Sequence, residues 1–256
     1  MDLGLKGRNV FITGATRGIG RAIADTFAAE GCNVAICARS QAEVDQALTD
    51  LSALGIKAVG KQVDVLAEGA LTTWVAEAGE QLGGLDILIS NVGAMAQGGD
   101  KESWMKNIQV DIFSLVDMIE AGKDFLKAAA AKHGDAAVIA VGSVASSVAS
   151  NVSSYGPVKS AMVHFIKGFA KQNAAKNIRA NVVSPGMVYF DGGIWQQTEQ
   201  ANPEFFKNAK ARNPTGRMAT PHEIADAVVF LASPKSSYTT GISLNVDGAL
   251  TDRVNF

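Results

Sequence analysis

Short apolar runs alternate with amphipathic stretches along the first two thirds of the chain. The runs are rich in Val, Ile and Ala and carry few charges, which is typical of strands buried on both faces of a sheet. Between the runs, apolar residues recur every three or four positions, which predicts helices. Because strands that alternate with helices pair in parallel, the pattern predicts an α/β fold: a Rossmann-like, doubly wound parallel sheet flanked by helices.

The same pattern places each expected element. Strands are expected at residues 9–13, 33–38, 56–63, 85–89 and 136–141. Helices are expected after the first strand as far as residue 31, at 41–54, 67–82 and about 101–132, and from residue 155 toward 175. In a sheet of this kind ligands bind at the carboxyl ends of the strands, so the residues just after each strand are candidates for a functional site.

Composition limits the classes of function. A chain of 256 residues can form one α/β domain with a substantial core, and we expect a single domain over residues 1–256. The net charge of −2 is small and no basic stripe is present, so we expect no nucleic-acid partner. We expect neither a secretory leader nor a membrane span, and the spacing of the histidines indicates no metal site.

The cysteines bear on the compartment. Cys32 directly precedes the expected strand at 33–38 and Cys37 lies on it, so their separation along the extended chain, about 16 Å, is too large for a disulfide between them. Packing thiols of this kind are typical of a reducing compartment. We therefore expect a cytoplasmic protein that acts on small molecules.

A glycine-rich turn follows the first strand and opens a helix. Its glycines allow a close approach to the backbone, and the amides of the helix N-terminus bind anions, which together form a phosphate site. A plain tight turn is the alternative, but the strand before it and the helix after it favour a dinucleotide site. The residues expected at this site are Gly14, Thr16, Arg17, Gly18, Ile19 and Gly20.

Two arginines indicate which dinucleotide is bound. A site that prefers NAD usually carries an acidic residue after the second strand, whereas this chain has Ala38 and then Arg39. Arg17 in the glycine turn is a second cation, and two guanidinium groups suit a 2′-phosphate. Either arginine alone is explained equally well as a solvated surface residue that binds no phosphate. Together they favour NADP over NAD.

Further polar residues stand at or after expected strand ends. Asp64, Asn91 and Ser143 each follow a strand, which would bring them to one edge of the sheet. Tyr155 and Lys159 are four residues apart, so on a helix they lie on one face. The lysine ammonium favours the phenolate form of the tyrosine, which makes the pair a candidate proton donor and acceptor.

The chain resembles the short-chain dehydrogenase/reductase family over essentially its whole length. The matching features, in order, are the glycine motif that begins at Thr13, the segment Asn91-Val92-Gly93, the set Ser143, Tyr155 and Lys159, the strand and turn that end at Pro185-Gly186, a helix-like segment at 217–234, and a final strand at 241–248. The resemblance implies a seven-stranded sheet and hydride transfer between a nicotinamide and a carbonyl or alcohol carbon.

The resemblance also implies roles for individual residues. It assigns proton transfer to Tyr155, binding of the substrate oxygen to Ser143, and binding of the nicotinamide ribose to Lys159. It further implies homo-oligomers, dimers or tetramers, formed through the long helices around Asp111 and Tyr155. The cofactor contacts that it implies beyond the glycine turn are Asp64, Val65, Asn91, Gly93, Pro185, Gly186 and the main chain of Val188.

The chain departs from the family pattern in three places. Gly156-Pro157 replaces the small residues usual after the tyrosine, and the proline is tolerable only in the first turn of the helix. Asp111 stands where the family usually has asparagine; it would keep a local helix distortion and place a negative charge near Lys159. Phe190 stands where the family often has a threonine that contacts the cofactor, so no such contact is expected.

Residues 189–214 have no strand character. In the family the corresponding segment forms a lid over the substrate pocket, with Gly192-Gly193 as a hinge and Trp195 and Phe205-Phe206 as an apolar wall. An amphipathic helix packed on the core is an equally good interpretation of these aromatic residues.

These features together predict an NADP(H)-dependent oxidoreductase that interconverts a ketone and a secondary alcohol, with a hydrophobic or cyclic substrate. One alternative is an NAD-dependent alcohol dehydrogenase. Another is a nucleotide-binding scaffold that has lost turnover through Asp111, against which the intact set of Ser143, Tyr155 and Lys159 argues.

Overall fold

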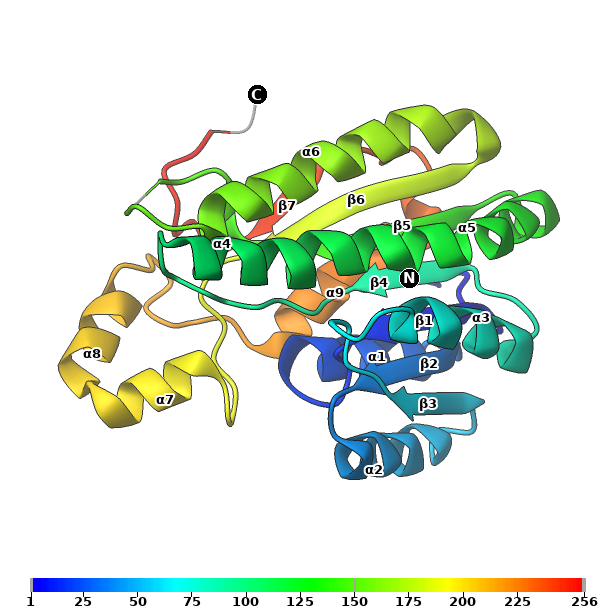
Figure 1. Ribbon diagram of the computed structural model, residues 1–256, viewed down its shortest axis with the longest axis horizontal. Coiled ribbons are helices and arrows are strands. Elements are labelled where there is room, and N and C mark those ends of the chain that lie inside the picture. Colours follow the sequence, from blue (N-terminus) through cyan, green and yellow to red (C-terminus); the bar gives the residue numbers. More distant parts are fainter. Residues whose placement is uncertain (1, 150, 255–256) are drawn as a thin grey trace.

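The computed structural model describes residues 2–149 and 151–254, and within these ranges seven strands pair in parallel into one sheet (Figure 1). The strand order is β3-β2-β1-β4-β5-β6-β7, which confirms the expected doubly wound sheet. The direction of winding reverses between β1 and β4, and such a reversal is where sheets of this kind bind ligands. The strands are β1 (Asn9–Thr13), β2 (Asn33–Ala38), β3 (Ala58–Gln62), β4 (Ile87–Ser90), β5 (Ala136–Val141), β6 (Ile178–Pro185) and β7 (Ser243–Val246).

Helices cover both faces of this sheet (Figure 1). One face packs against α1 (Gly18–Ala29), α2 (Gln41–Ser52) and α9 (Pro221–Ala232). The other packs against α3 (Ala70–Leu82), α5 (Ser114–His133) and α6 (Tyr155–Asn173). Successive side chains of a strand point to opposite faces, so Val10 and Ile12 enter the first core and Phe11 enters the second. The continuous apolar runs of the sequence are explained by these two cores.

Several boundaries differ from the expected ones, and backbone conformation explains the clearest cases. The helix expected at 67–82 begins only at Ala70, because Gly69 before it has a φ of +70°. The strand expected at 241–248 is limited to Ser243–Val246, because Gly241 and Gly248 both have positive φ and do not continue the sheet.

The long helical region expected at about 101–132 is interrupted. It consists of α4 (Lys101–Asn107), a π-helical turn at Ile108–Phe113, and α5. A π-helical turn adds a residue to the helix and often marks a functional site. This turn is the helix distortion expected around Asp111.

Two short helices lie outside the two layers, beyond the carboxyl edge of the sheet (Figure 1). They are α7 (Ile194–Ala201) and α8 (Pro203–Ala211), and they pack against each other. The side chain of Asn202 caps α8 by accepting a hydrogen bond from the Phe205 amide. None of the helices within the described ranges combines the length and apolar character needed to cross a membrane.

Candidate active site

Tyr155 and Lys159 lie on the first two turns of α6, with the Lys159 ammonium 5.8 Å from the centre of the Tyr155 ring. Tyr155 is partly exposed, whereas Lys159 is only 3% exposed. Pro157 is the third residue of the helix, where its missing N–H leaves no intrahelical bond unmade. The fold therefore places a phenol at the mouth of the site and a buried cation behind it.

Lys159 is held by two oxygen atoms. Its ammonium donates a hydrogen bond to the Val141 carbonyl oxygen at 3.1 Å and lies 2.8 Å from Asp111 Oδ1. Asp111 is 1% exposed, and its Oδ2 accepts a hydrogen bond from the Ala94 amide. Asp111 Oδ1 accepts no aligned hydrogen bond from the described part of the chain, so its contact with Lys159 is a purely ionic one. The carboxylate compensates the charge of a lysine that burial would otherwise disfavour.

Ser143 follows β5 and caps a short 3₁₀ helix, Val144–Ser146, where its Oγ accepts a hydrogen bond from the Ala145 amide. This segment packs closely on the start of α6. Ser160 Oγ donates to the Ser146 carbonyl oxygen, and a Cβ at Gly156 would lie 2.9 Å from the Ala145 oxygen. The serine and the tyrosine are thus carried by two segments that are fixed against each other.

The turn after β1 is shaped for a close approach of a ligand to the backbone. Gly14 and Gly18 have φ values of +66° and +55°. A Cβ at Gly20 would collide with the Gly14 carbonyl oxygen and with the Asn91 side chain. Asn91 Nδ2 donates to the carbonyl oxygens of Thr13 and Gly14, which fixes the turn against the loop after β4. The cradle ends at the N-terminus of α1, so these residues fit the phosphates of a dinucleotide.

The other expected cofactor residues at or near this turn differ in what their side chains contact. Thr16 Oγ1 donates to Glu43 Oε2 at 2.9 Å, and Ile19 is partly buried against the first core. Arg17 and Arg39 are exposed, and within the described ranges neither guanidinium has a hydrogen-bond or ion-pair partner. Both arginines remain available to an anionic ligand.

The remaining cofactor candidates lie at the ends of three other strands. Asp64 is exposed, with its carboxylate accepting from the Leu66 amide, and Val65 packs against the second core. A Cβ at Gly93 would lie 3.2 Å from Asp111 Oδ1 and 3.6 Å from Lys159 Nζ, so this glycine borders the buried ion pair.

The turn after β6 contains main-chain groups that form no hydrogen bond within the described ranges, those of Val188. The Gly186 amide donates to the Val246 carbonyl oxygen, which continues the pairing of Pro185 with β7. Val188 forms a parallel bridge with Ala219, and in that arrangement its own N–H and C=O point away from the bridge. Neither group has a partner within residues 2–149 and 151–254, although Val188 is only 7% exposed. Such a buried, unpaired amide edge fits a ligand carboxamide.

Two features of the site were not recognised from the sequence. The first is the position of Phe190, whose ring lies against Gly18: a Cβ there would be 2.6 Å from its ring atoms. The second is Asn107, which is fully buried. Its amide binds both main-chain groups of Ala96 and the hydroxyl of Ser154, next to Tyr155. A polar residue at a buried position of the expected helix was the signal that could have identified Asn107.

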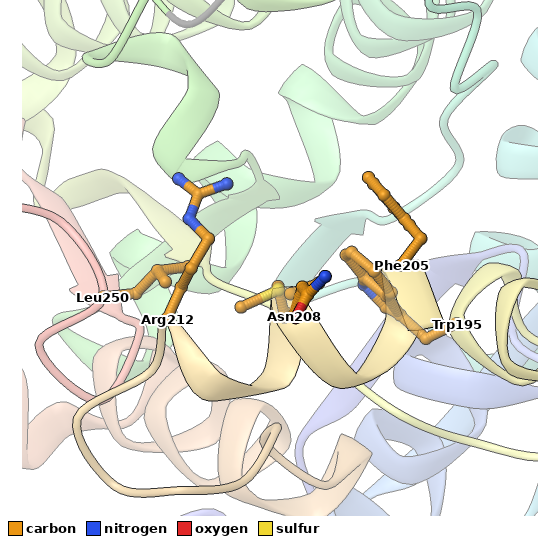
Figure 2. A pocket seen from close by; sticks show the side chains of 7 residues that line it. Trp195, Phe205, Asn208, Arg212 and Leu250 are labelled. Atoms are coloured by element: carbon orange, nitrogen blue, oxygen red, sulfur yellow. The ribbon is translucent and has the colours of Figure 1, made fainter. Parts of the chain in front are cut away.

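The segment 189–214 borders a cavity of about 260 Å³ (Figure 2). Tyr189 Oη donates a hydrogen bond to Glu199 Oε2 at 2.6 Å, and this bond to the carboxylate raises the pKa of the phenol. The Trp195 and Phe205 rings are nearly parallel, with an interplanar angle of 10°. The residues that line the cavity are Met187, Trp195, Phe205, Asn208, Ala209, Arg212 and Leu250.

Comparison with known proteins agrees with this geometry. A family model described as "Enoyl-(Acyl carrier protein) reductase" matches residues 14–251. Isoepoxydon dehydrogenase patN of Penicillium expansum is 34% identical over 255 residues, which covers 98% of this chain and 97% of that protein.

Solved structures agree in the same way. L-sorbose reductase from Gluconobacter frateurii, complexed with NADPH and L-sorbose, superimposes with a TM-score of 0.89 at 26% identity, covering 99% of this chain and 100% of that one. The NADH-dependent reductase A1-R′, responsible for alginate metabolism, superimposes with a TM-score of 0.85 at 27% identity, covering 98% and 100%. These relatives span the full length of the chain and use both nicotinamide cofactors.

Proposed function

Because the chain belongs to the short-chain dehydrogenase/reductase family of oxidoreductases, we propose that it interconverts a ketone and a secondary alcohol with NADP(H). The observation that carries this proposal is the placement of Tyr155, with Lys159 behind it and the Ser143 segment packed against it, at the carboxyl edge of the sheet. A phenol backed by a buried ammonium is suited to transfer a proton at neutral pH.

Each residue then has a defined task. When bound, the nicotinamide supplies or accepts the hydride. Tyr155 donates a proton to the carbonyl oxygen during reduction and removes it during oxidation. Ser143 Oγ holds the same oxygen beside the phenol, and Lys159 binds the nicotinamide ribose. Val188 offers its unpaired N–H and C=O to the nicotinamide carboxamide.

Asp111 acts through Lys159 as a positioning residue. Its carboxylate lies 2.8 Å from the ammonium. Asp111→Asn removes the negative charge and keeps the shape of the side chain. If Asp111 only maintains the helix, we expect turnover to be retained or raised; if its carboxylate belongs to the proton relay, we expect the pH profile for alcohol oxidation to move.

The measurement is kcat as a function of pH with saturating cofactor, together with the thermal midpoint of each variant. An unchanged profile in a folded Asp111→Asn protein would show that the carboxylate is not coupled to the proton transfer. Asp117→Asn is a matched control, because Asp117 is exposed on the same helical region.

The preference for NADP rests on Arg17 and Arg39, which have no partners in the described ranges. A charge-assisted bond to the 2′-phosphate contributes about 1.5–3 kcal/mol, so one arginine changes affinity roughly tenfold or more. We expect Ala38→Asp combined with Arg39→Leu to invert the preference, because the phosphate loses a partner and the ribose gains an acceptor.

The test is kcat/KM for NADPH and NADH in wild type and in the double variant. Lys235→Leu is the control for loss of one cation, since Lys235 lies before β7 at the opposite edge of the sheet. A wild-type preference for NADH would favour the alternative of an NAD-dependent alcohol dehydrogenase. Absence of turnover with every ketone tested would favour the non-catalytic scaffold.

We also propose that the protein forms homo-oligomers through α5 and α6. A groove of about 610 Å³ runs between these helices, and its lining combines apolar with charged side chains. The apolar ones include Phe165 and Phe169 from α6 and Val116 from α5, and the charged ones include Glu120, Lys123 and Lys127 from α5. Apolar side chains in an open groove on two long helices support a helix-to-helix contact with a second copy.

A cytoplasmic location is supported by the cysteines. Cys32 and Cys37 are both buried and free. Burial raises the pKa of each thiol to about 12, so both stay protonated and unreactive.

A further inference from the structure

The cavity beside the lid helices combines apolar walls with one cation. Trp195 and Phe205 form one wall, with ring centres 6.5 Å apart, and Met187 and Leu250 form another. Figure 2 shows Phe205 and Arg212 extending from the same side of α8. Residues 208, 209 and 212 follow residue 205 by three, four and seven positions, so the four share one helix face, which runs along α8 to its C-cap residue Arg212 and borders the cavity.

The cation of this cavity is not neutralised by the protein. Among the residues that the structure describes, the Arg212 guanidinium has no hydrogen-bond or ion-pair partner. Four arginines are paired with carboxylates: Arg8 with Asp86, Arg21 with Asp25 and Asp50, Arg179 with Asp135, and Arg217 with Glu223. Within the described ranges Arg17, Arg39 and Arg253 have no such partner.

No carboxylate lines the described cavity, and two acidic groups of the neighbouring segments are already engaged. Glu199 accepts from Tyr189, and Asp247 accepts from Thr251 and from the Ala249 amide. Arg212 therefore resembles Arg17 and Arg39, the two unpaired arginines for which the proposed cofactor supplies the anion.

The cavity is adjacent to the proposed nicotinamide site. Met187, which lines it, immediately precedes Val188, whose free peptide edge faces the cofactor in the proposed function. Ser143 and Tyr155 do not line the cavity, so a molecule held there at one end would extend past Met187 to bring its carbonyl group to Tyr155. The volume of about 260 Å³ suits a single-ring molecule, since pockets for larger ligands begin at roughly 300 Å³.

We propose that this cavity binds the carboxylate end of the substrate, and that the substrate is a cyclic keto acid or the corresponding hydroxy acid. Arg212 pairs with the carboxylate, the Asn208 amide supplies a further donor, and the ring packs against Trp195 and Phe205. This inference rests on the proposed function, because it identifies the substrate class of the same site.

The test compares a charged ketone with its neutral analogue. 4-Oxocyclohexanecarboxylate and 4-oxocyclohexanecarboxamide differ in charge but hardly in shape. We expect wild type to reduce the carboxylate with a kcat/KM at least tenfold above that of the carboxamide. Arg212→Met should lower kcat/KM for the carboxylate ten- to hundredfold, mainly through KM, and change the value for the carboxamide less than twofold.

A matched variant and a second measurement separate the possible failures. Lys207→Met removes a cation from α8 at a position that does not line the cavity, and it should leave the preference for the carboxylate unchanged. Calorimetric binding of cyclohexanecarboxylate, which has no carbonyl group to reduce, should be at least tenfold weaker in Arg212→Met than in wild type.

Equal binding of cyclohexanecarboxylate to both proteins, or equal reduction of both ketones by wild type, would overturn the role of Arg212. Tight binding that depends on Arg212, but without turnover of either ketone, would support the anion subsite and contradict the proposed reaction. The two inferences therefore fail in distinguishable ways.

Discussion

Replacement of Tyr155 by phenylalanine is expected to lower turnover by roughly a hundredfold or more, the usual scale for the loss of an acid–base group. The ring remains, so the contact with the Lys159 ammonium at 5.8 Å and the packing of α6 are preserved. Because only the hydroxyl is lost, cofactor binding should stay close to wild type. The measurements are kcat with the best ketone found and the dissociation constant of NADPH from its fluorescence.

Tyr189→Phe is the matched control for this variant. Tyr189 also carries a hydrogen-bonded phenol and also lies at the carboxyl edge of the sheet, but its partner is Glu199 of α7. We expect its kcat to change only a few fold. A Tyr155→Phe protein that turns over as fast as Tyr189→Phe would refute the proton-transfer role of Tyr155.

Arg179→Met is expected to lower the free energy of unfolding by about 3–5 kcal/mol, the usual cost of removing one partner of a buried ion pair. Arg179 lies on β6 and is 4% exposed. Its guanidinium binds both carboxylate oxygens of Asp135, at 2.7 and 3.1 Å. It also donates to the carbonyl oxygens of Leu231, Ala232 and Ser233, which end α9 without partners in the helix itself.

The measurement is urea unfolding, analysed by linear extrapolation with the m-value compared between variants. Arg217→Met is the control, since Arg217 and Glu223 form an ion pair on the surface. Exposed pairs contribute little, so the control should lose far less stability than Arg179→Met. Equal losses in the two variants would mean that the carbonyl contacts of Arg179 do not stabilise the end of α9.

The sheet and the position of Tyr155 relative to Lys159 could be predicted because both depend on local patterns. A buried strand is marked by its own apolar run, and a spacing of four residues fixes two side chains on one helix face. The start of α9 is another local feature: Thr220 and Glu223 are three residues apart and form a reciprocal pair of capping hydrogen bonds.

Contacts between distant segments could not be predicted in the same way. The ring of Phe190 lies against Gly18. The hydrophobic pattern around either residue does not indicate that the two are in contact. The cavity at Arg212 likewise requires the relative placement of α8, the turn after β6 and the C-terminal segment. Strand ends such as those of β3 shifted because edge strands are only partly buried, so their hydrophobic pattern is weak.

The hydrogen bonds of Asn91 have a thermodynamic consequence for the cofactor. The Asn91 side chain binds the carbonyl oxygens of Thr13 and Gly14, and the Thr13 hydroxyl accepts from the Asn91 amide. The loops on either side of the topological reversal are therefore ordered before any dinucleotide arrives. Conformational entropy that a flexible glycine loop would lose on association has already been lost on folding, so it does not weaken the affinity for the phosphates.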